Sequence, residues 1–406
     1  MKTSEEIFLY IDKSACCGCG VCSIICPQNA IRISTDEFGC QYPVVDKLRC
    51  VKCGKCIHSC NYKHTPNLHS SISYWIAINR QQEIRKASTS GGFFSAISQF
   101  AINAGGSVYG CAWVNSEEVL EARHIRVNSL EDLSLIRCSK YVQSNISFCL
   151  EQVKDDILKN RLVVFSGTPC QIDGLYGYLN NKKYDNLITI EVICHGVPGS
   201  GLFKDYLRNV EKKEKGKITA IRFRDKDNGG WSHGGIYEIR KNKIYKKKIY
   251  PNISSYYNLF LNGTLSRINC YSCPYASLSR CADFTIGDCW GINEDELMAE
   301  SCTFQLKEGV SCVIVNTQKA NQLIHYLHDY IYLFPTSYEK IRKGNIHLSD
   351  PTKKNVKHDY VMELYRKDGY EAVDKWFNRR LGIKKFLYKL WNLLPLEIKK
   401  KIKNDL

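Results

Sequence analysis

Eight cysteines in the first part of the chain follow two copies of one spacing. Within residues 16–26, and again within residues 50–60, three cysteines stand three residues apart and a fourth follows four residues later. They are Cys16, Cys19, Cys22, Cys26, Cys50, Cys53, Cys56 and Cys60. In such a run, three thiolates bind one four-iron cube and the fourth binds the other cube. The spacing therefore predicts two [4Fe–4S] clusters.

The trailing cysteine of each run decides which thiolates share a cluster. One cluster is expected on Cys16, Cys19, Cys22 and Cys60, and the other on Cys50, Cys53, Cys56 and Cys26. The alternatives are zinc knuckles or disulfides, but zinc favours well-separated C-x2-C pairs rather than triplets with a fourth ligand behind them. The arrangement is that of a bacterial ferredoxin, which predicts electron transfer.

Composition favours an intracellular redox protein. The 406 residues include 21 cysteines, an odd number that argues against a fully paired disulfide framework. Residues 1–10 contain two acids and no apolar run suited to export. Exposed thiolates are easily oxidised, so a reducing, cytoplasmic setting is expected. No apolar stretch reaches the roughly 18 residues of a membrane-spanning helix.

Short elements must position the eight cysteines. Each run is followed by a helical turn, and short strands are expected at residues 30–34 and 42–45. The two halves form an internal repeat with a 34-residue offset. The first domain is predicted to cover residues 1–67, and the polar segment 61–71 is predicted to be a linker.

Beyond the linker, helices and strands alternate. The expected helices cover residues 93–103 and 319–330, and the expected strands cover 107–114, 162–165, 187–193 and 311–316, with antiparallel strands at 217–224, 235–240 and 244–250. Residues 72–343 are therefore predicted to form one larger mixed α/β domain, and 345–406 a short helical basic tail. The predicted fold class is α+β.

Two kinds of site stand out in the larger domain. Ser90-Gly91-Gly92 precedes the helix expected at residue 93, where free backbone N–H groups suit a phosphate, although a simple N-cap with a flexible turn explains the same pattern. No G-x-G-x-x-G follows a strand, so nothing supports a Rossmann site. Cys170 and Cys194 each follow a predicted strand, and Cys270-x2-Cys273 is a metal-type pair. Four thiolates could converge there.

Several motifs occur in one order: Ser90-Gly91-Gly92, Lys140-Tyr141, Gly167-Thr168-Pro169-Cys170-Gln171, Cys194-His195-Gly196 and residues 270–291. Behind a ferredoxin cassette, this order resembles the beta-subunit family of coenzyme F420 (deazaflavin) reducing hydrogenases and dehydrogenases, over about residues 10–320. The resemblance implies a non-covalent FAD in a non-Rossmann pocket, with a [4Fe–4S] cluster beside it. It places Ser90, Gly91, Gly92, Lys140 and Asp288 in the flavin pocket.

The resemblance also implies ligands for the inner cluster, namely Cys170, Cys194, Cys270 and Cys273. Cys281 and Cys289 are rivals, because they form a local set with Cys270 and Cys273. The first set is preferred because Cys281 and Cys289 flank an apolar strand, where a buried cysteine acts as a small hydrophobe. Core positions are expected for Cys40, Cys111, Cys138, Cys149, Cys302 and Cys312.

A polar and aromatic loop at residues 222–233 departs from the deazaflavin enzymes. It resembles a branch of the family from bacterial polysaccharide loci, and it suits an anionic substrate such as a sugar phosphate. A hairpin with solvated charges is the alternative. His195 and His233 are candidates for donating protons to a substrate, although a lone histidine is more often structural.

The formal net charge is +16, and much of the excess lies near the C-terminus. Residues 383–394 are amphipathic and basic, and residues 399–403 add four lysines. The segment suits peripheral contact with an anionic membrane, docking on an acidic partner, or packing of a terminal helix. No recognised nucleic-acid motif accompanies the charge, so nucleic acid is not expected as a partner.

These features together predict a flavin-dependent iron–sulfur oxidoreductase. Electrons would enter from a donor protein or reduced cofactor, cross the N-terminal clusters and an inner cluster, and reach FAD and a small-molecule or sugar substrate, or run in reverse. The alternative is a non-catalytic electron-transfer subunit that serves a separate enzyme.

Overall fold

An eight-stranded mixed sheet forms the centre of the computed structural model, which describes residues 9–64, 68–116, 119–228, 230–292, 297, 304–394 and 398. The strand order is β13-β3-β12-β11-β7-β6-β4-β5. The strands are β3 (Ser73–Asn79), β4 (Ser107–Ser116), β5 (Val119–Val127), β6 (Val163–Gly167), β7 (Leu187–Val192), β11 (Phe284–Asp288), β12 (Ser311–Val315) and β13 (Ile331–Pro335). The neighbours β11, β7, β6 and β4 run parallel, so their carboxyl ends meet at one edge.

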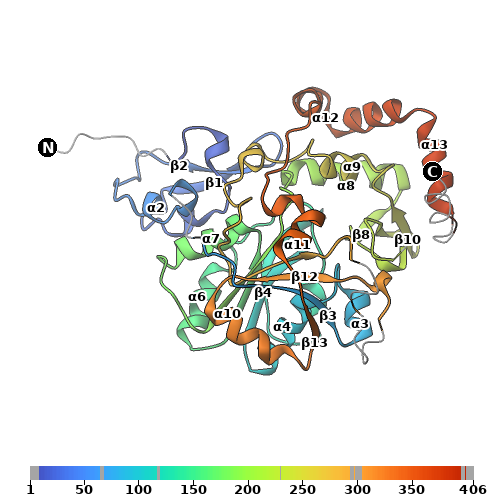
Figure 1. Cartoon of the computed structure of the whole chain (residues 1–406). Coiled ribbons are helices and arrows are strands. Elements are labelled where there is room, and N and C mark those ends of the chain that lie inside the picture. Colours follow the sequence, from blue (N-terminus) through green and yellow to red (C-terminus); the bar gives the residue numbers. More distant parts are fainter. Residues whose placement is uncertain are drawn as a thin grey trace.

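Helices cover both faces of this sheet (Figure 1). Successive side chains of a strand point to opposite faces, so strands that are apolar throughout must be covered on both sides. Val164 of β6 packs with Phe93 and Ile97 on one face. Its neighbours Val163 and Phe165 pack on the other face, against α6 and α7. The helices of the sheet region are α3 (Gln82–Ala87), α4 (Phe93–Asn103), α5 (Leu133–Ile136), α6 (Leu150–Leu158), α7 (Pro169–Tyr178), α10 (Gln318–Leu323) and α11 (Tyr338–Gly344).

The N-terminal segment is a small repeat that packs beside α7 (Figure 1). It contains α1 (Val21–Ile24), β1 (Ile31–Thr35), β2 (Gln41–Val45) and α2 (Lys55–His58), and β1 pairs antiparallel with β2. Gly20 and Gly54, one repeat apart, precede α1 and α2 with left-handed φ angles of 80° and 74°. Gly18 and Lys52 also share positive φ. The expected 34-residue repeat is therefore present in the backbone itself.

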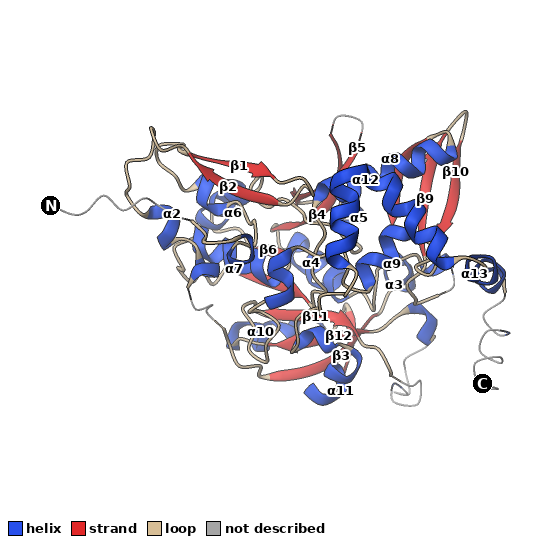
Figure 2. Cartoon of the chain, turned by 90° about the horizontal axis from the view of Figure 1, so that it is seen from above, coloured by secondary structure: helices blue, strands red, loops and turns tan. Residues whose placement is uncertain are grey.

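A second core lies under a three-stranded antiparallel sheet, β10-β9-β8 (Figure 2). Its strands are β8 (Lys217–Arg222), β9 (Gly235–Arg240) and β10 (Ile244–Ile249), and its helices are α8 (Ser200–Glu214), α9 (Ser255–Leu261) and α12 (His358–Leu381). α12 is interrupted by non-helical backbone at Gly369. Val361, Tyr365 and Val373 of α12 are buried in this core. α13 (Lys384–Leu393) follows at the periphery with no buried residue.

The predicted α+β fold class is confirmed. The helix expected at residues 93–103 is α4, and the strands expected at 107–114, 162–165 and 187–193 are β4, β6 and β7. The helix expected at 319–330 is instead α10 followed by a 3-10 turn, Ile324–Leu327. No described helix is both long enough and apolar enough to cross a membrane. The domain limits at residues 67, 72, 343 and 345 stay predictions.

Candidate functional site

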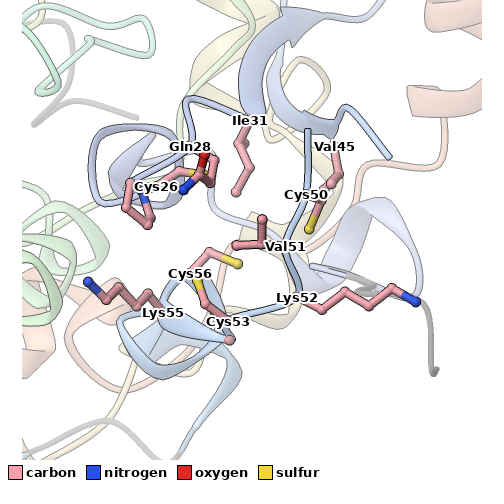
Figure 3. Close-up of a pocket in the computed structure, with 12 residues that line it drawn as sticks. Cys26, Gln28, Ile31, Val45, Cys50, Val51, Lys52, Cys53, Lys55 and Cys56 are labelled. Carbon is pink, nitrogen blue, oxygen red and sulfur yellow. The ribbon is translucent and has the colours of Figure 1, made fainter. Parts of the chain in front are cut away.

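Four of the N-terminal cysteines surround one open space (Figure 3). Cys26, Cys50, Cys53 and Cys56 line it with the apolar side chains of Ile31, Val45 and Val51. The backbone N–H of Ala30 donates to Cys26 Sγ at 3.3 Å. Burial, with the neighbouring Cys26 and Cys50, raises the pKa of Cys56. Thiolates around an apolar space, with N–H donors to sulfur, fit an iron–sulfur cluster.

The other four N-terminal cysteines form a second, more enclosed group. Burial, with the charge of Cys19, raises the pKa of Cys16 to about 12. Cys60 contributes to that shift, and burial together with Cys19, Cys16 and Cys60 raises the pKa of Cys22. Gly18 N donates to Cys16 Sγ at 3.4 Å. Buried thiolates that repel one another need positive charge between them, which the irons of a cluster supply.

Neither group is arranged around a single ion. Among the described residues, no three His, Cys, Asp or Glu side chains are close enough to hold one metal ion. In a four-iron cube each thiolate binds a different iron, so its ligands stand farther apart than those of zinc.

The inner cysteines meet at the carboxyl edge of the large sheet. Cys170 follows β6 and Cys194 follows the adjacent β7, while Cys270 lies in a 3-10 helix, Ile268–Ser272, and Cys273 comes directly after it. Gly196 has a φ of 94°, and a Cβ there would lie 3.2 Å from Cys270 Cβ. Burial raises the pKa of Cys194, and so do the charges of Cys270, Cys170 and Cys273. The structure therefore brings these four sulfurs together.

The rival cysteines point elsewhere. Cys281 Sγ donates to Glu191 Oε2 at 2.9 Å and to Pro169 O at 3.3 Å. Cys289 is buried in a separate apolar cluster together with Cys312. This arrangement favours the set that contains Cys170 and Cys194 over the local set with Cys281 and Cys289.

The remaining cysteines fall into three groups. Cys40, Cys149 and Cys312 are buried. Cys111 and Cys138 are partly exposed, and Cys138 Sγ donates to Ala87 O at 3.3 Å. Cys302 lies outside the described residues.

The enclosed N-terminal group lies directly against the inner group, a contact that the sequence did not indicate. A Cβ on Gly174 of α7 would lie 3.2 Å from Cys19 Sγ. Cys170 is in the first turn of the same helix. Cys170 and Cys19 both hold the pKa of Cys17 well above its usual range, so the thiol of Cys17, which the spacing does not count as a ligand, lies beside both groups. α7 therefore holds the two groups next to each other.

The residues expected in the flavin pocket also converge. Ser90 Oγ donates to Val310 O at 2.5 Å and to Gly287 O at 3.4 Å, which places it next to Asp288. Gly91 N donates to Ser311 Oγ at 2.9 Å, and a Cβ on Gly91 would lie 2.3 Å from Ala77 O. Ser139 N donates to Thr89 Oγ1 at 3.2 Å, which brings Lys140 to the same turn.

Three basic side chains gather around this turn at the start of α4. Lys226 Nζ donates to Ser90 O and Arg85 O, each at 2.6 Å, and burial lowers the pKa of Lys226 to about 7. Lys140 Nζ donates to Arg137 O at 2.6 Å, and Arg137 Nε donates to Ser95 Oγ at 3.1 Å. A helix N-terminus with nearby cations fits the diphosphate of FAD. No motif marked Arg137, and Lys226 was noted only as part of the loop at residues 222–233.

Asp288 anchors the loop at residues 222–233. Its carboxylate accepts from Arg224 Nη1 at 2.8 Å and from Trp231 Nε1 at 2.7 Å. Trp231 stacks on Trp290 with ring centroids 4.5 Å apart. The loop thus closes over the end of β11, although Gly229 lies outside the described residues. The carboxylate of Asp288 is therefore occupied in holding Arg224 and Trp231 of the loop, and it is not a free carboxylate.

The two candidate histidines lie in this region. Burial lowers the pKa of His195 and that of His233 to about 4, so both imidazoles are neutral at pH 7. His195 stands edge-on to His347 with centroids 4.3 Å apart. Its Nε2 is buried without a hydrogen-bond partner among the described residues.

The fold and the grouped cysteines define an iron–sulfur redox protein. Residues 9–32 match the family model of the 4Fe-4S binding domain. Residues 160–340 match the family model for the C terminus of the coenzyme F420 hydrogenase/dehydrogenase beta subunit. The resemblance expected from the ordered motifs is thus confirmed. The protein is an iron–sulfur, oxidoreductase-like electron-transfer protein related to that beta subunit.

Among solved structures, one similar chain belongs to the xenon-derivatized F420-reducing [NiFe] hydrogenase complex from Methanosarcina barkeri. It is 13% identical, the match covers 73% of this chain and 93% of that one, and the TM-score is 0.47. No curated protein matches.

Proposed function

We propose that the protein is a flavin-dependent iron–sulfur oxidoreductase with two N-terminal [4Fe–4S] clusters, a third inner one and FAD. The supporting observation is the contact made by α7. It carries Cys170 of the inner group and packs through Gly174 on Cys19 of the enclosed N-terminal group. A short, protein-filled separation suits electron transfer between the two groups.

Each group of side chains has a separate task. The twelve cysteines hold the clusters, and the apolar walls around them exclude water. The turn at Ser90-Gly91-Gly92, with Lys140, would bind the diphosphate of FAD at the start of α4. When bound, FAD exchanges an electron pair with a substrate and single electrons with the clusters. Asp288 keeps the loop at residues 222–233 in place above the site.

The substrate region is proposed beside this loop. His195 Nε2 is buried and unpartnered among the described side chains, so it can hydrogen-bond a bound substrate. Arg222 and Arg224 pair with Asp225 and Asp288, each at 2.8 Å. We propose a small-molecule or sugar substrate in polysaccharide metabolism, as the loop resemblance implies.

A reductive titration tests the proposed cofactor set. The purified chain should take up about five electrons, two for FAD and one for each of three clusters. The measurement is an anaerobic dithionite titration followed by absorbance and electron paramagnetic resonance. A chain that takes up only about two electrons would be a ferredoxin-type carrier. Turnover of sugar substrates by the chain alone would then separate an enzyme from an electron-transfer subunit with the same cofactors.

We also propose that α13 makes a peripheral contact with an anionic membrane surface. Phe386 and Leu393 are 62% and 79% exposed, and Leu387 and Leu390 are exposed beside them. Lys384, Lys385 and Lys389 lie on the same short helix. An exposed apolar face flanked by lysines suits the interface of an acidic bilayer. The lysines of residues 399–403 lie outside the described residues.

Vesicle binding tests this helix. The intact protein should bind anionic vesicles at low salt, because each lysine contributes about 1 kcal/mol near acidic lipid. Binding should weaken as salt rises, and Leu390→Glu should reduce it further. Ile346→Glu, which changes another exposed apolar residue, is the control. Equal binding to neutral vesicles, or no binding at low salt, would identify α13 as a packing or partner helix.

A further inference from the structure

Among the described residues, one buried arginine has no acidic partner. Arg85, Arg224, Arg267 and Arg280 are the buried arginines of the described chain. Arg85 pairs with Glu308 at 2.7 Å, Arg224 pairs with Asp288 at 2.8 Å, and Arg280 pairs with Glu191. Arg267 is only 2% exposed, and it takes part in no ion pair among the described residues. A buried charge without a counter-charge is strongly unfavourable, so Arg267 needs a negative group that side-chain carboxylates do not provide.

Neutral groups fix the guanidinium of Arg267 in place. Nη1 donates to Gln143 Oε1 at 2.6 Å, and Nε donates to Asn269 Oδ1 at 3.0 Å. Nη2 donates to the carbonyls of Cys16 at 3.1 Å and Gln41 at 3.2 Å. The guanidinium also stands 4.7 Å from the ring centroid of Tyr42. These contacts use all three nitrogens of the guanidinium and hold it rigidly, but none of them balances its charge.

Arg267 stands between the enclosed N-terminal cysteines and the inner cysteines. One Nη2 bond reaches the backbone of Cys16, and the carbonyl of Arg267 accepts from Cys270 N at 3.0 Å. A Cβ on Gly18, two residues after Cys16, would lie 3.0 Å from Arg267 Nη2. The guanidinium therefore lies against the loop that carries Cys16, while the backbone of Arg267 bonds the turn that carries Cys270.

We propose that Arg267 is a positioning residue whose buried charge is balanced by the two clusters on either side of it and raises the reduction potential of both. Each cluster gains one negative charge on reduction, and a nearby cation stabilises the reduced form. The cluster on Cys26, Cys50, Cys53 and Cys56 lacks this neighbour, so electrons would move from it toward the pair. The inference rests on the proposed clusters but goes beyond them, because it concerns their relative potentials.

Redox titration of three variants tests the role of the charge. Iron content is measured first, and the potential of each cluster is then followed by electron paramagnetic resonance. In Arg267→Gln, the ratio of reduced to oxidised cluster at a fixed potential should fall at least tenfold for the two adjacent clusters, a shift of about 59 mV for one electron. The distant cluster should not change. Arg267→Lys keeps the charge and should stay close to the native potentials.

Gln143→Glu adds a counter-charge without removing Arg267. It places a carboxylate on Nη1, and so it should lower the same two potentials. It also loses the bonds from Gln143 Nε2 to Cys17 O and Gly18 O, so its iron content is measured before its potentials. The double variant, Gln143→Glu with Arg267→Gln, should lower the two potentials by less than the sum of the shifts of the two single variants. Arg85→Gln removes a buried arginine that pairs with Glu308 away from the clusters, and it should leave all the potentials unchanged.

The contrary outcomes are distinct. Unchanged potentials in both Arg267→Gln and Gln143→Glu would overturn the proposal. Equal shifts in Arg267→Lys and Arg267→Gln would assign the effect to packing and overturn it as well. If Arg267→Gln loses iron, Gln143→Glu decides the question. A native protein without the inner cluster would contradict the proposed function instead, and iron content shows that before any potential is measured.

Discussion

Anaerobically reconstituted protein should carry about twelve irons per chain, as three four-iron cubes. Cys170→Ser and Cys273→Ser should each lower this toward about eight, because a serine oxygen is a poorer ligand for iron than a thiolate. The two N-terminal clusters should survive these changes, since their eight cysteines lie on other segments. Iron and sulfide assays, combined with electron paramagnetic resonance of the reduced protein, give the count.

Cys281→Ser is the matched control for these variants. Cys281 is buried, its thiol donates to Glu191 Oε2, and a serine hydroxyl can make the same bond. Iron content should therefore stay at its native value, and Cys289→Ser should behave likewise. If Cys281→Ser strips the inner cluster while Cys194→Ser does not, the ligand assignment is wrong even though the cluster exists.

The sequence was informative wherever the chemistry is local. The spacing of the N-terminal cysteines predicted a repeat, and the left-handed Gly20 and Gly54 show it in the backbone. The apolar periodicity before Gly105 predicted the limits of α4, since this pattern belongs to the helix itself. The placement of Cys170 and Cys194 followed from a general rule, that parallel strands gather sites at their carboxyl ends.

Sequence reasoning missed what depends on contacts between distant segments. Arg267 is separated by more than two hundred residues from the Cys16 carbonyl that it bonds, and nothing in its neighbours marks it. The spacing of the motif assigns no role to Cys17, yet its thiol lies beside Cys170 and Cys19, which only the fold brings together. The edge strand β13 was not predicted, because its pairing partner β3 lies far away in the sequence.

The second large effect concerns the flavin. Anaerobically purified protein should release about one FAD per chain on denaturation, measured by chromatography of the supernatant. Lys140→Gln should weaken FAD binding roughly tenfold, the effect of losing one charge-assisted contact of about 1.4 kcal/mol. Lys140→Arg keeps the charge and should retain FAD. Lys86→Gln, an exposed lysine on α3, is the control.

Bulky residues at Gly91 and Gly92 should also empty the flavin site, but they would disturb the neighbouring strands and the backbone as well as the binding turn. A side chain at Gly91 would press on Ala77 O and on Ser311 N, which lies only 2.6 Å from its Cβ, so it would disturb β3 and β12 as well as the turn. Gly92 has a φ of 90°, where any side chain adds strain. Lys140→Gln is therefore the cleaner variant, because it leaves the sheet intact. Full cluster content without any flavin, after gentle anaerobic purification of the native chain, would contradict the proposed enzyme and favour an electron carrier.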